Sequence, residues 1–261
     1  MNTAHFTEQL LAGRLLVGTQ VASPSPLWPS ALDGIGLDFV FLDTEHIPVD
    51  RMTLSWMCQT FSYMGLPPLV RIPSPDTVEA TKVLDGGAAG VIVPYVETAD
   101  QVRALAGAVK FRPIKGQRLA DRLRGVSFEP RLEDYVRRRN SSALILFIES
   151  VPALRALDEI LAVPGVDGVL IGPHDLTCSL GVPEEYDHPE YLAACKTILT
   201  KARAAGVGAG VHWWGSVEEH ARFVSFGANL VSYNCDLTVF PQYLRQEVPA
   251  LKKLTSAGVR N

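Results

Sequence analysis

The chain alternates eight times between a short apolar run and a stretch with the spacing of an amphipathic helix. Runs that are apolar throughout are typical of strands buried on both faces, and helical crossovers between such strands produce a parallel sheet. We therefore expect eight parallel strands, at residues 15–19, 37–42, 68–72, 90–94, 144–148, 165–171, 207–212 and 229–233.

Eight such units are the number that closes a (β/α)8, or TIM, barrel. The chain has 261 residues, of which 47% are hydrophobic, and shows no break in composition, so it fits one barrel domain over residues 1–261. The alternative is a doubly wound open sheet, which usually carries a glycine-rich nucleotide fingerprint after its first strand. The segment GTQVASPSP lacks that fingerprint and favours the barrel.

Helices are expected at 7–11, around Leu32, and at 54–61, 76–85, 99–109, 151–163, 188–205, 217–226 and 242–254. Residues 110–140 have no regular pattern and are expected to be irregular. A structureless segment of that length inside a compact domain usually forms a lid, a binding loop or an assembly element.

Charge and composition argue against several classes of function. The net charge is −4, and acidic residues interrupt the arginine-rich segment 112–139, so we expect neither nucleic-acid binding nor membrane association. We see no membrane-spanning run and no signal-peptide pattern. The four cysteines have no CxxC or zinc-ligand spacing, which favours reduced thiols in a cytoplasmic protein.

Polar side chains gather where the expected strands end. They are Asp43, Glu45, His46, Arg71, Glu149, Asp175 and His212. TIM-barrel enzymes carry their active sites at this end of the strands. Any one of these side chains could instead form a structural ion pair or a satisfied polar contact in the core, which is the commoner role of a histidine such as His212. Their joint occurrence at one rim favours a functional site.

These residue types suit one kind of chemistry. Two carboxylates, Glu149 and Asp175, without cysteine or histidine ligand patterns favour a hard cation such as Mg²⁺ or Mn²⁺. Arg71 can hold a planar carboxylate through two hydrogen bonds. His46 lies three residues after Asp43, a spacing at which the carboxylate can orient an acid–base imidazole. Together they suit enolate chemistry on a 2-oxo acid.

At these residues the chain resembles the HpcH/HpaI class II aldolases, metal-dependent enzymes of the phosphoenolpyruvate- and pyruvate-binding barrel superfamily. The resemblance rests on GLDFVFLDTEHIPVD, PPLVRIPSPD, VLDGGAAGVIVPYVETADQVRAL, FIESVPALRALDEILAVPGVDGVLIGPHDLTCSLG and the later GA…VSYNCD, from about Gly36 to Asp236. It implies a lyase that reversibly cleaves 4-hydroxy-2-oxo acids to pyruvate and an aldehyde, with Mg²⁺, Mn²⁺ or Co²⁺ as cofactor.

The resemblance also assigns roles to individual residues. Glu149 and Asp175 match the two metal ligands of the family. Arg71 matches the arginine that holds the pyruvate carboxylate and steadies the enolate. His46 with Asp43 matches the general acid–base dyad.

Further positions are matched outside this group. Gly172 and Pro173 match a loop whose backbone contacts the 2-oxo acid, and Asp85 matches an acidic residue that reaches a neighbouring subunit's site. Family members assemble as hexamers, described as trimers of dimers with an exchanged C-terminal helix. The resemblance therefore implies a homo-oligomer in which the helix at 242–254 takes part in assembly.

Three positions depart from the family pattern. Phe147 stands where members often carry glutamine, two residues before the metal-ligand glutamate. His174 replaces a common alanine or serine and can either enter the pocket as a substrate contact or turn outward. The segment KGQRLADRLRG agrees only loosely with the family's glycine-rich loop, which leaves the aldehyde open.

Other functions are compatible with the same residues. One alternative is a CoA-thioester lyase of the citramalyl or malyl type, which keeps the metal and the enolate but needs a basic site for the CoA tail. Another is a catalytically inactive barrel with a binding role. Trp213 and Trp214 can line the mouth of a pocket or simply cover helix ends, and Tyr95 and Glu97 can contact a ligand.

Overall fold

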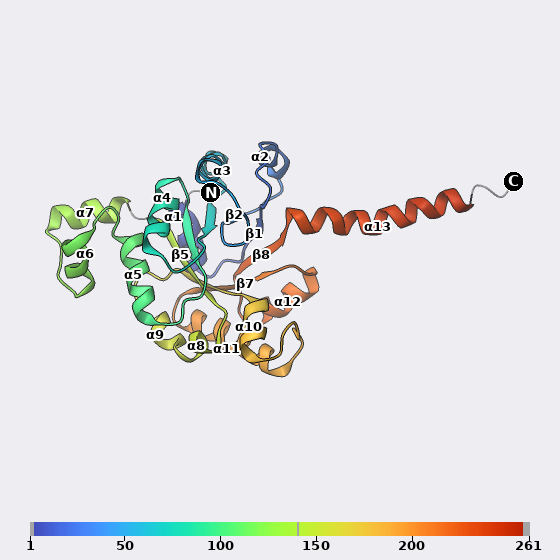
Figure 1. The fold of residues 1–261 in the computed structure, drawn as a ribbon. Coiled ribbons are helices and arrows are strands. Elements are labelled where there is room, and N and C mark those ends of the chain that lie inside the picture. The colour runs from blue at the N-terminus through green and yellow to red at the C-terminus, as the bar shows by residue number, and fades with distance from the viewer. Residues whose placement is uncertain (1–2, 140, 258–261) are drawn as a thin grey trace.

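The computed structural model describes residues 3–139 and 141–257. Eight parallel strands pair in chain order, and β1 closes the barrel against β8 (Figure 1). The strands are β1 Leu16–Gln20, β2 Phe39–Asp43, β3 Pro68–Arg71, β4 Gly90–Val93, β5 Ala143–Ile148, β6 Gly168–Ile171, β7 Gly208–Trp213 and β8 Leu230–Cys235. The predicted TIM barrel is confirmed.

Most of the expected helices are present with shifted ends. They are α1 Thr3–Leu11, α2 Trp28–Leu32, α3 Arg51–Tyr63, α4 Thr77–Asp85, α5 Ala99–Lys110, α11 Pro189–Ala204 and α12 Val217–Ser225. The segment expected as one helix at 151–163 is two short ones, α8 Val151–Arg155 and α9 Leu157–Leu161, which meet at Ala156. Capping side chains fix the N-terminal ends of several helices. Before α3, for example, Asp50 accepts hydrogen bonds from the backbone N–H groups of Met52 and Thr53.

The alternation of side chains along each strand separates two apolar clusters. In β5, Ile145 and Phe147 point into the barrel, whereas Leu144 and Leu146 pack between the sheet and the helices. Helix α1 adds Phe6 and Leu10 to the interior cluster. Strand residues two positions apart share a face. A polar residue that follows an interior side chain by two positions at the C-terminal end of a strand therefore lies on the interior side as well.

The prediction that 110–140 is irregular was wrong. The described part holds α6 Gly116–Leu123 and α7 Pro130–Arg139, which lie at the edge of the barrel (Figure 1); Asn140 lies outside the described residues. Arg122 lies over the rings of Phe111 and Phe128, 5.0 and 5.1 Å from their centroids, and pairs with Glu133 of α7 at 2.9 Å. Arginine–aromatic contacts and ion pairs contribute to this unit, and they recur at a helical spacing of four residues, as at Arg118 and Arg122.

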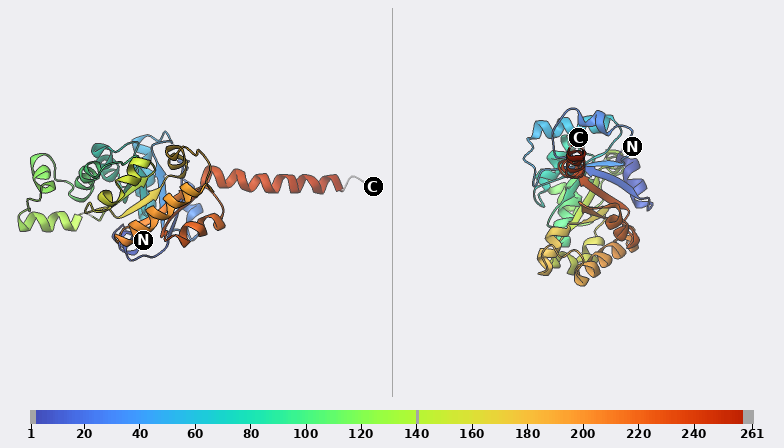
Figure 2. Two further views of the ribbon diagram at one scale, coloured as in Figure 1. Left: turned by 90° about the horizontal axis from the view of Figure 1, so that it is seen from below. Right: turned by 90° about the vertical axis from the view of Figure 1, so that its right-hand side faces the viewer.

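Two other helices differ from expectation. Helix α10, Pro173–Leu180, was not predicted; it begins at a proline directly after Gly172 and ends at Gly181, which adopts a left-handed conformation (φ 79°). The last helix, α13, runs over Asp236–Ala257 rather than 242–254, and starts directly after β8. It extends away from the barrel, as Figure 1 and the left view of Figure 2 show.

Candidate active site

A cavity of about 500 Å³ lies at the C-terminal ends of the strands. Its lining contains most of the residues selected from the sequence, together with two that were not, Glu184 and Tyr186. The lining residues are His46, Arg71, Phe147, Glu149, Gly172, Pro173, His174, Asp175, Glu184, Tyr186, His212, Trp213 and Trp214. The structure therefore brings together side chains from the ends of β2, β3, β5, β6 and β7, as expected of a barrel active site.

Arg71 is held by two carboxylates at the edge of this cavity. Its Nε and Nη2 donate to Oδ1 and Oδ2 of Asp43 at 2.8 and 2.6 Å, and its Nη1 lies 3.2 Å from Oε2 of Glu45. Asp43 and Arg71 are buried, with 3% and 6% of their surfaces exposed. Burial works to raise the pKa of Asp43, but the bonds and charge of Arg71 outweigh it and hold that pKa below its ordinary value.

The expected contact between Asp43 and His46 is not in the structure. Both Asp43 oxygens face Arg71, whereas Nε2 of His46 lies 3.6 Å from Oε2 of Glu45. The pairing differs because Asp43 continues the interior face of β2, while His46 lies in the following loop with its side chain 63% exposed. Glu45 therefore bridges Arg71 and His46, a role that the sequence left open.

Glu149 and Asp175 are linked through one residue, Tyr95. The Tyr95 backbone N–H donates to Oε1 of Glu149 at 2.7 Å, and the Tyr95 hydroxyl donates to Oδ1 of Asp175 at 2.6 Å. Tyr95 adopts a left-handed backbone conformation (φ 49°), which is uncommon for a non-glycine residue and found most often at functional sites. The only signal in the sequence was its position just after the fourth strand.

Gly172 leaves room for the Glu149 carboxylate. A Cβ atom at position 172 would lie 2.3 Å from Oε2 of Glu149, closer than any side chain tolerates. The glycine at the end of β6 therefore allows the two neighbouring strands to place Glu149 and Asp175 at the same rim.

The two carboxylates fit a divalent cation. Within residues 3–139 and 141–257, no Lys, Arg or His lies within 4.0 Å of Glu149 or Asp175. Burial, together with the nearby negative charge of Asp175, raises the pKa of Glu149 to about 8. The described part of the chain has no cluster of three or more His, Cys, Asp or Glu able to hold a metal. A two-carboxylate seat with open positions suits Mg²⁺ or Mn²⁺, which retain water or substrate as further ligands.

His212 lies at the floor of the cavity among aromatic rings. Phe41 and Trp214 approach it edge-on, at 4.7 and 5.9 Å between ring centroids, and its Nδ1 is 2.9 Å from Oγ of Ser232. Burial and the charge of Arg71 lower the His212 pKa to about 3, so the ring is neutral. Phe147 is fully buried, and the centroid of its ring lies 5.4 Å from the guanidinium carbon of Arg71. It therefore offers Arg71 an aromatic face but no hydrogen bond.

His174 and Glu184 stand at the mouth of the cavity. His174 lines it, and its Nδ1 lies 3.8 Å from Oε1 of Glu184. Their side chains are 62% and 72% exposed. The imidazole therefore reaches the cavity from its solvent side, and Trp213 and Trp214 line the cavity as well as covering the barrel end.

Asp85 does not belong to this cavity. It lies at the C-terminal end of α4, where it pairs with Arg112 at 3.4 Å and borders a separate depression with Pro113 and Tyr135. Within the single chain it has no contact with the Glu149–Asp175 pair, so the expected role in a neighbouring subunit's site stays a prediction.

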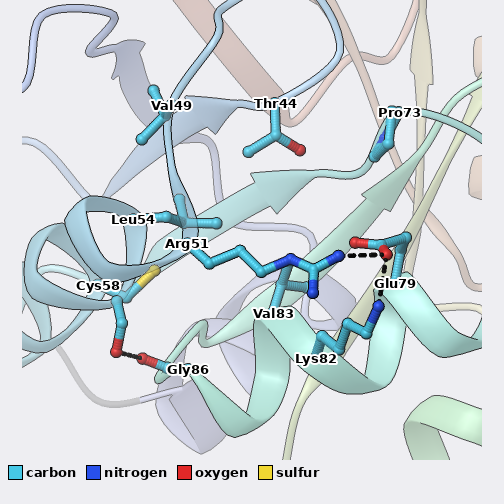
Figure 3. Close-up of a pocket in the computed structure, with 11 residues that line it drawn as sticks. Thr44, Val49, Arg51, Leu54, Cys58, Pro73, Glu79, Lys82, Val83 and Gly86 are labelled. Carbon is cyan, nitrogen blue, oxygen red and sulfur yellow. Dashed lines mark hydrogen bonds and ion pairs between the residues drawn. The ribbon is translucent and has the colours of Figure 1, made fainter.

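A smaller cavity, about 190 Å³, lies between α3 and α4 (Figure 3). Arg51 and Lys82 both bind Glu79 there, at 3.0 and 2.9 Å. This cavity shares no lining residue with the larger one, because the loop after β2 separates them: Thr44 faces the smaller cavity and His46 the larger.

Comparison with known proteins assigns this geometry to a family. The model of the HpcH/HpaI aldolase/citrate lyase family matches residues 18–242. The chain belongs to this family. It is similar to 2-keto-3-deoxy-L-rhamnonate aldolases from Shigella sonnei (strain Ss046), at 32% identity, and Escherichia coli O157:H7, at 31%; each match covers 96% of this chain and 94% of the relative. The chain is thus an aldolase-type lyase.

Solved structures agree with this assignment. An HpcH/HpaI aldolase from Desulfitobacterium hafniense DCB-2 superimposes with a TM-score of 0.81 at 27% identity, covering 94% of this chain and 95% of that one. The citrate synthase SbnG superimposes equally well, with a TM-score of 0.81 at 25% identity over 96% and 98% of the two chains. Dependence on a divalent metal is general in the family. In the described part of the chain, no helix is long and apolar enough to cross a membrane.

Proposed function

We propose that this protein is a divalent-metal-dependent class II aldolase that cleaves 4-hydroxy-2-oxo acids reversibly to pyruvate and an aldehyde. The observation that carries the proposal is the pairing of Glu149 and Asp175 through Tyr95, beside a buried Arg71 in the same cavity. Relatives named 2-keto-3-deoxy-L-rhamnonate aldolase make that compound the first substrate to test.

Glu149 and Asp175 would hold Mg²⁺, Mn²⁺ or Co²⁺. When bound, the cation would withdraw negative charge from the 2-oxo oxygen of the substrate. Tyr95 keeps both carboxylates in place, since it hydrogen-bonds to one oxygen of each.

Arg71 would bind the carboxylate of the 2-oxo acid. A guanidinium has five N–H groups, and three of the Arg71 nitrogens already face Asp43 or Glu45. One N–H on each terminal nitrogen remains, which suffices for a second, bidentate partner on the cavity side. Asp43 and Glu45 thereby orient Arg71, and Gly172 and Pro173 line the site next to the metal ligands.

His46 is the residue we assign to proton transfer. Cleavage removes a proton from the 4-hydroxyl, and addition returns one to the new hydroxyl oxygen, so a base must lie at the cavity edge. His46 lines the cavity beside Glu45, which can orient the imidazole in the way first expected of Asp43. His212 is unsuited to this role, because a pKa of about 3 makes it too weak a base to take up a proton near neutral pH.

Pyruvate release from a panel of 4-hydroxy-2-oxo acids, coupled to lactate dehydrogenase, tests the proposal. Metal-free protein should be inactive and should regain activity with Mg²⁺, Mn²⁺ or Co²⁺, whereas Arg71→Ala and Glu149→Ala should stay inactive. Full activity in excess chelator would contradict the metal requirement. Release of pyruvate only from CoA thioesters would replace the aldolase by a CoA-thioester lyase.

We also infer that the protein is a cytoplasmic homo-oligomer, a hexamer by the family pattern. Helix α13 supports assembly, because it extends from the barrel (Figure 2). It also carries a series of exposed apolar side chains. They include Leu237, Phe240, Tyr243, Leu251 and Leu254. A series of exposed apolar side chains on a helix that extends from the fold marks a surface for another protein chain. All four cysteines carry free thiols, which suits a reducing compartment.

A further inference from the structure

Part of the cavity lining is formed by large aromatic rings. Tyr186, Trp213 and Trp214, here called the aromatic wall, all line the cavity. Tyr186 and Trp213 pack edge-on with ring centroids 4.6 Å apart. Trp214 is 54% exposed although it lines the cavity, so a large apolar surface there is open to whatever binds beside the metal ligands. Such a surface favours a ligand with apolar faces.

Negatively charged side chains outnumber positively charged ones around the cavity. Among the described residues that line the cavity, Arg71 alone has a permanent positive charge, and it already faces Asp43 and Glu45. Negative charges come from Glu149, Asp175 and the Glu184 at the mouth. A divalent cation would balance the first two, but the pyruvate carboxylate would add one more. A second carboxylate on the substrate would find, among the described lining residues, only the imidazoles of His46 and His174, which already lie beside Glu45 and Glu184.

An acidic groove of about 560 Å³ continues from the aromatic wall. It shares Glu184, Tyr186 and Trp213 with the larger cavity. Its other acidic residues are Glu185, Asp187 and Glu219, and its one arginine, Arg222, is paired with Asp187 at 2.6 Å. A long substrate leaving the cavity in this direction would therefore meet net negative charge.

We propose that the aldehyde portion of the substrate lies against the aromatic wall, and that Glu184 restricts it to uncharged, hydroxylated aldehydes. Carbon–hydrogen faces of such an aldehyde pack on Trp214, while its hydroxyl groups can donate to the Glu184 carboxylate. Aldehydes that end in a carboxylate, and CoA thioesters with their anionic tail, are disfavoured by the same charge. This proposal rests on the aldolase function proposed above.

The selection acts in the bond-forming direction of the reaction. The C3 carbon of the pyruvate enolate forms a bond to the aldehyde carbon, and the aldehyde oxygen takes up a proton and becomes the 4-hydroxyl. Oxaloacetate provides a reaction without an aldehyde: its C3–C4 bond breaks, CO₂ leaves, and the electron pair remains on the pyruvate enolate, which then takes up a proton. Decarboxylation of oxaloacetate therefore reports on the pyruvate half of the site alone.

The first experiment compares three aldehydes of similar length with the metal-loaded protein and pyruvate: lactaldehyde, propanal and succinic semialdehyde. We expect kcat/KM for lactaldehyde to exceed that for succinic semialdehyde by about tenfold or more, and propanal, which lacks the hydroxyl, to fall between them. Equal or better use of succinic semialdehyde would overturn the inference while leaving the aldolase intact. Failure of both aldol addition and oxaloacetate decarboxylation would overturn the aldolase and the inference together.

Two variants test which residues select the aldehyde. Each aldol-addition rate is divided by the rate of oxaloacetate decarboxylation by the same variant. Glu184→Lys should lower the ratio of the lactaldehyde rate to the succinic semialdehyde rate by about tenfold. Glu190→Lys is the control, because it makes the same charge change outside both the cavity and the groove. Trp214→Ala should lower relative lactaldehyde addition by about tenfold, unlike Trp56→Ala on α3, where the tryptophan is 69% exposed. Unchanged ratios in both Glu184→Lys and Trp214→Ala would overturn the assignment.

Discussion

Arg71 and Asp43 form a bidentate pair between neighbouring strands, with Nε and Nη2 of the guanidinium 2.8 and 2.6 Å from the two carboxylate oxygens. Both side chains are nearly inaccessible to solvent. A buried pair of this geometry can exist only when each charge satisfies the other, because either one alone would lose its solvation without compensation. The arginine is thereby fixed at the strand ends before any substrate arrives.

Removing one member of this pair should be costly. We expect Asp43→Ala to lower the free energy of unfolding by about 3 kcal/mol, because it leaves Arg71 buried with Glu45 as its remaining carboxylate partner and without its bidentate hydrogen bonds. Urea denaturation followed by circular dichroism measures the change. Asp50→Ala, which removes an exposed helix cap of α3, is the matched control and should cost about 1 kcal/mol. An equal decrease in the free energy of unfolding in the two variants would show that the buried pair contributes no more to stability than an exposed helix cap.

Gly172→Ala should disturb the metal site without touching a ligand. The new Cβ would lie 2.3 Å from Oε2 of Glu149, so the carboxylate must move or the strands must separate. We expect metal affinity, measured by isothermal titration calorimetry, to fall about 10–100-fold, as when an orienting contact is lost. Gly168→Ala on the same strand, where the nearest atoms lie 3.4 Å away, should retain metal affinity. An unchanged affinity in Gly172→Ala would contradict the placement of Glu149.

Tyr95→Phe tests the link between the two carboxylates. It removes the 2.6 Å hydrogen bond to Asp175 and keeps the backbone bond to Glu149. We expect metal affinity to fall about tenfold and pyruvate release at limiting metal to fall with it, since Asp175 is then free to rotate. Excess metal should restore most of the activity. Tyr63→Phe, on a tyrosine that is 89% exposed, is the control; similar behaviour of the two variants would argue against the link.

His212 should make the protein less stable in acid. Its folded-state pKa of about 3 lies below the ordinary value of 6.5, so between these two pH values the unfolded chain binds a proton that the native protein does not. This contribution is complete above about pH 6.5 and is lost as pH falls toward 3, with a slope of at most about 1.4 kcal/mol per pH unit.

The substitution His212→Gln should flatten that slope. Denaturation midpoints between pH 4 and pH 7 are compared for wild type, His212→Gln and His5→Gln, the last being an exposed histidine on α1. The difference between His212→Gln and wild type should shrink as the pH falls. A difference that is independent of pH would mean that His212 takes up its proton in the native state as readily as in the unfolded chain.

Helix α13 should control the state of assembly. Leu251 and Leu254 are 59% and 70% exposed on a helix that extends away from the barrel. We expect the double substitution Leu251→Glu and Leu254→Glu to lower the molecular mass measured by light scattering, because burying two charges opposes association. Gln242→Glu with Gln246→Glu adds the same charge to the same helix and should keep the assembly. A monomeric wild-type protein would contradict this prediction outright.

The strands were predictable because their signal is local. A run such as LILFI is apolar at every position since both faces of β5 are buried, and this shows in the sequence without reference to any partner. The helical pair α6–α7 was missed because charged side chains carry its helical period. Arg118 and Arg122, four residues apart on α6, both lie over the Phe128 ring. They pair with Glu129 and Glu133, which are also four residues apart, and a search for apolar periodicity does not register such contacts. Helix α10 was missed because Gly172-Pro173 also fits a turn.

By itself, the sequence determined the barrel and the set of polar residues at its rim. Alternation along a strand has a period of two residues, so Phe41 and Phe147 inside the barrel dictate that Asp43 and Glu149 follow on the same side. Only the tertiary structure decided which residues pair. Asp43 faces Arg71 rather than His46, Glu45 joins them, and Tyr95 connects two carboxylates 26 residues apart in the chain, at 149 and 175. Such pairings depend on distances across the closed barrel, which no local pattern encodes.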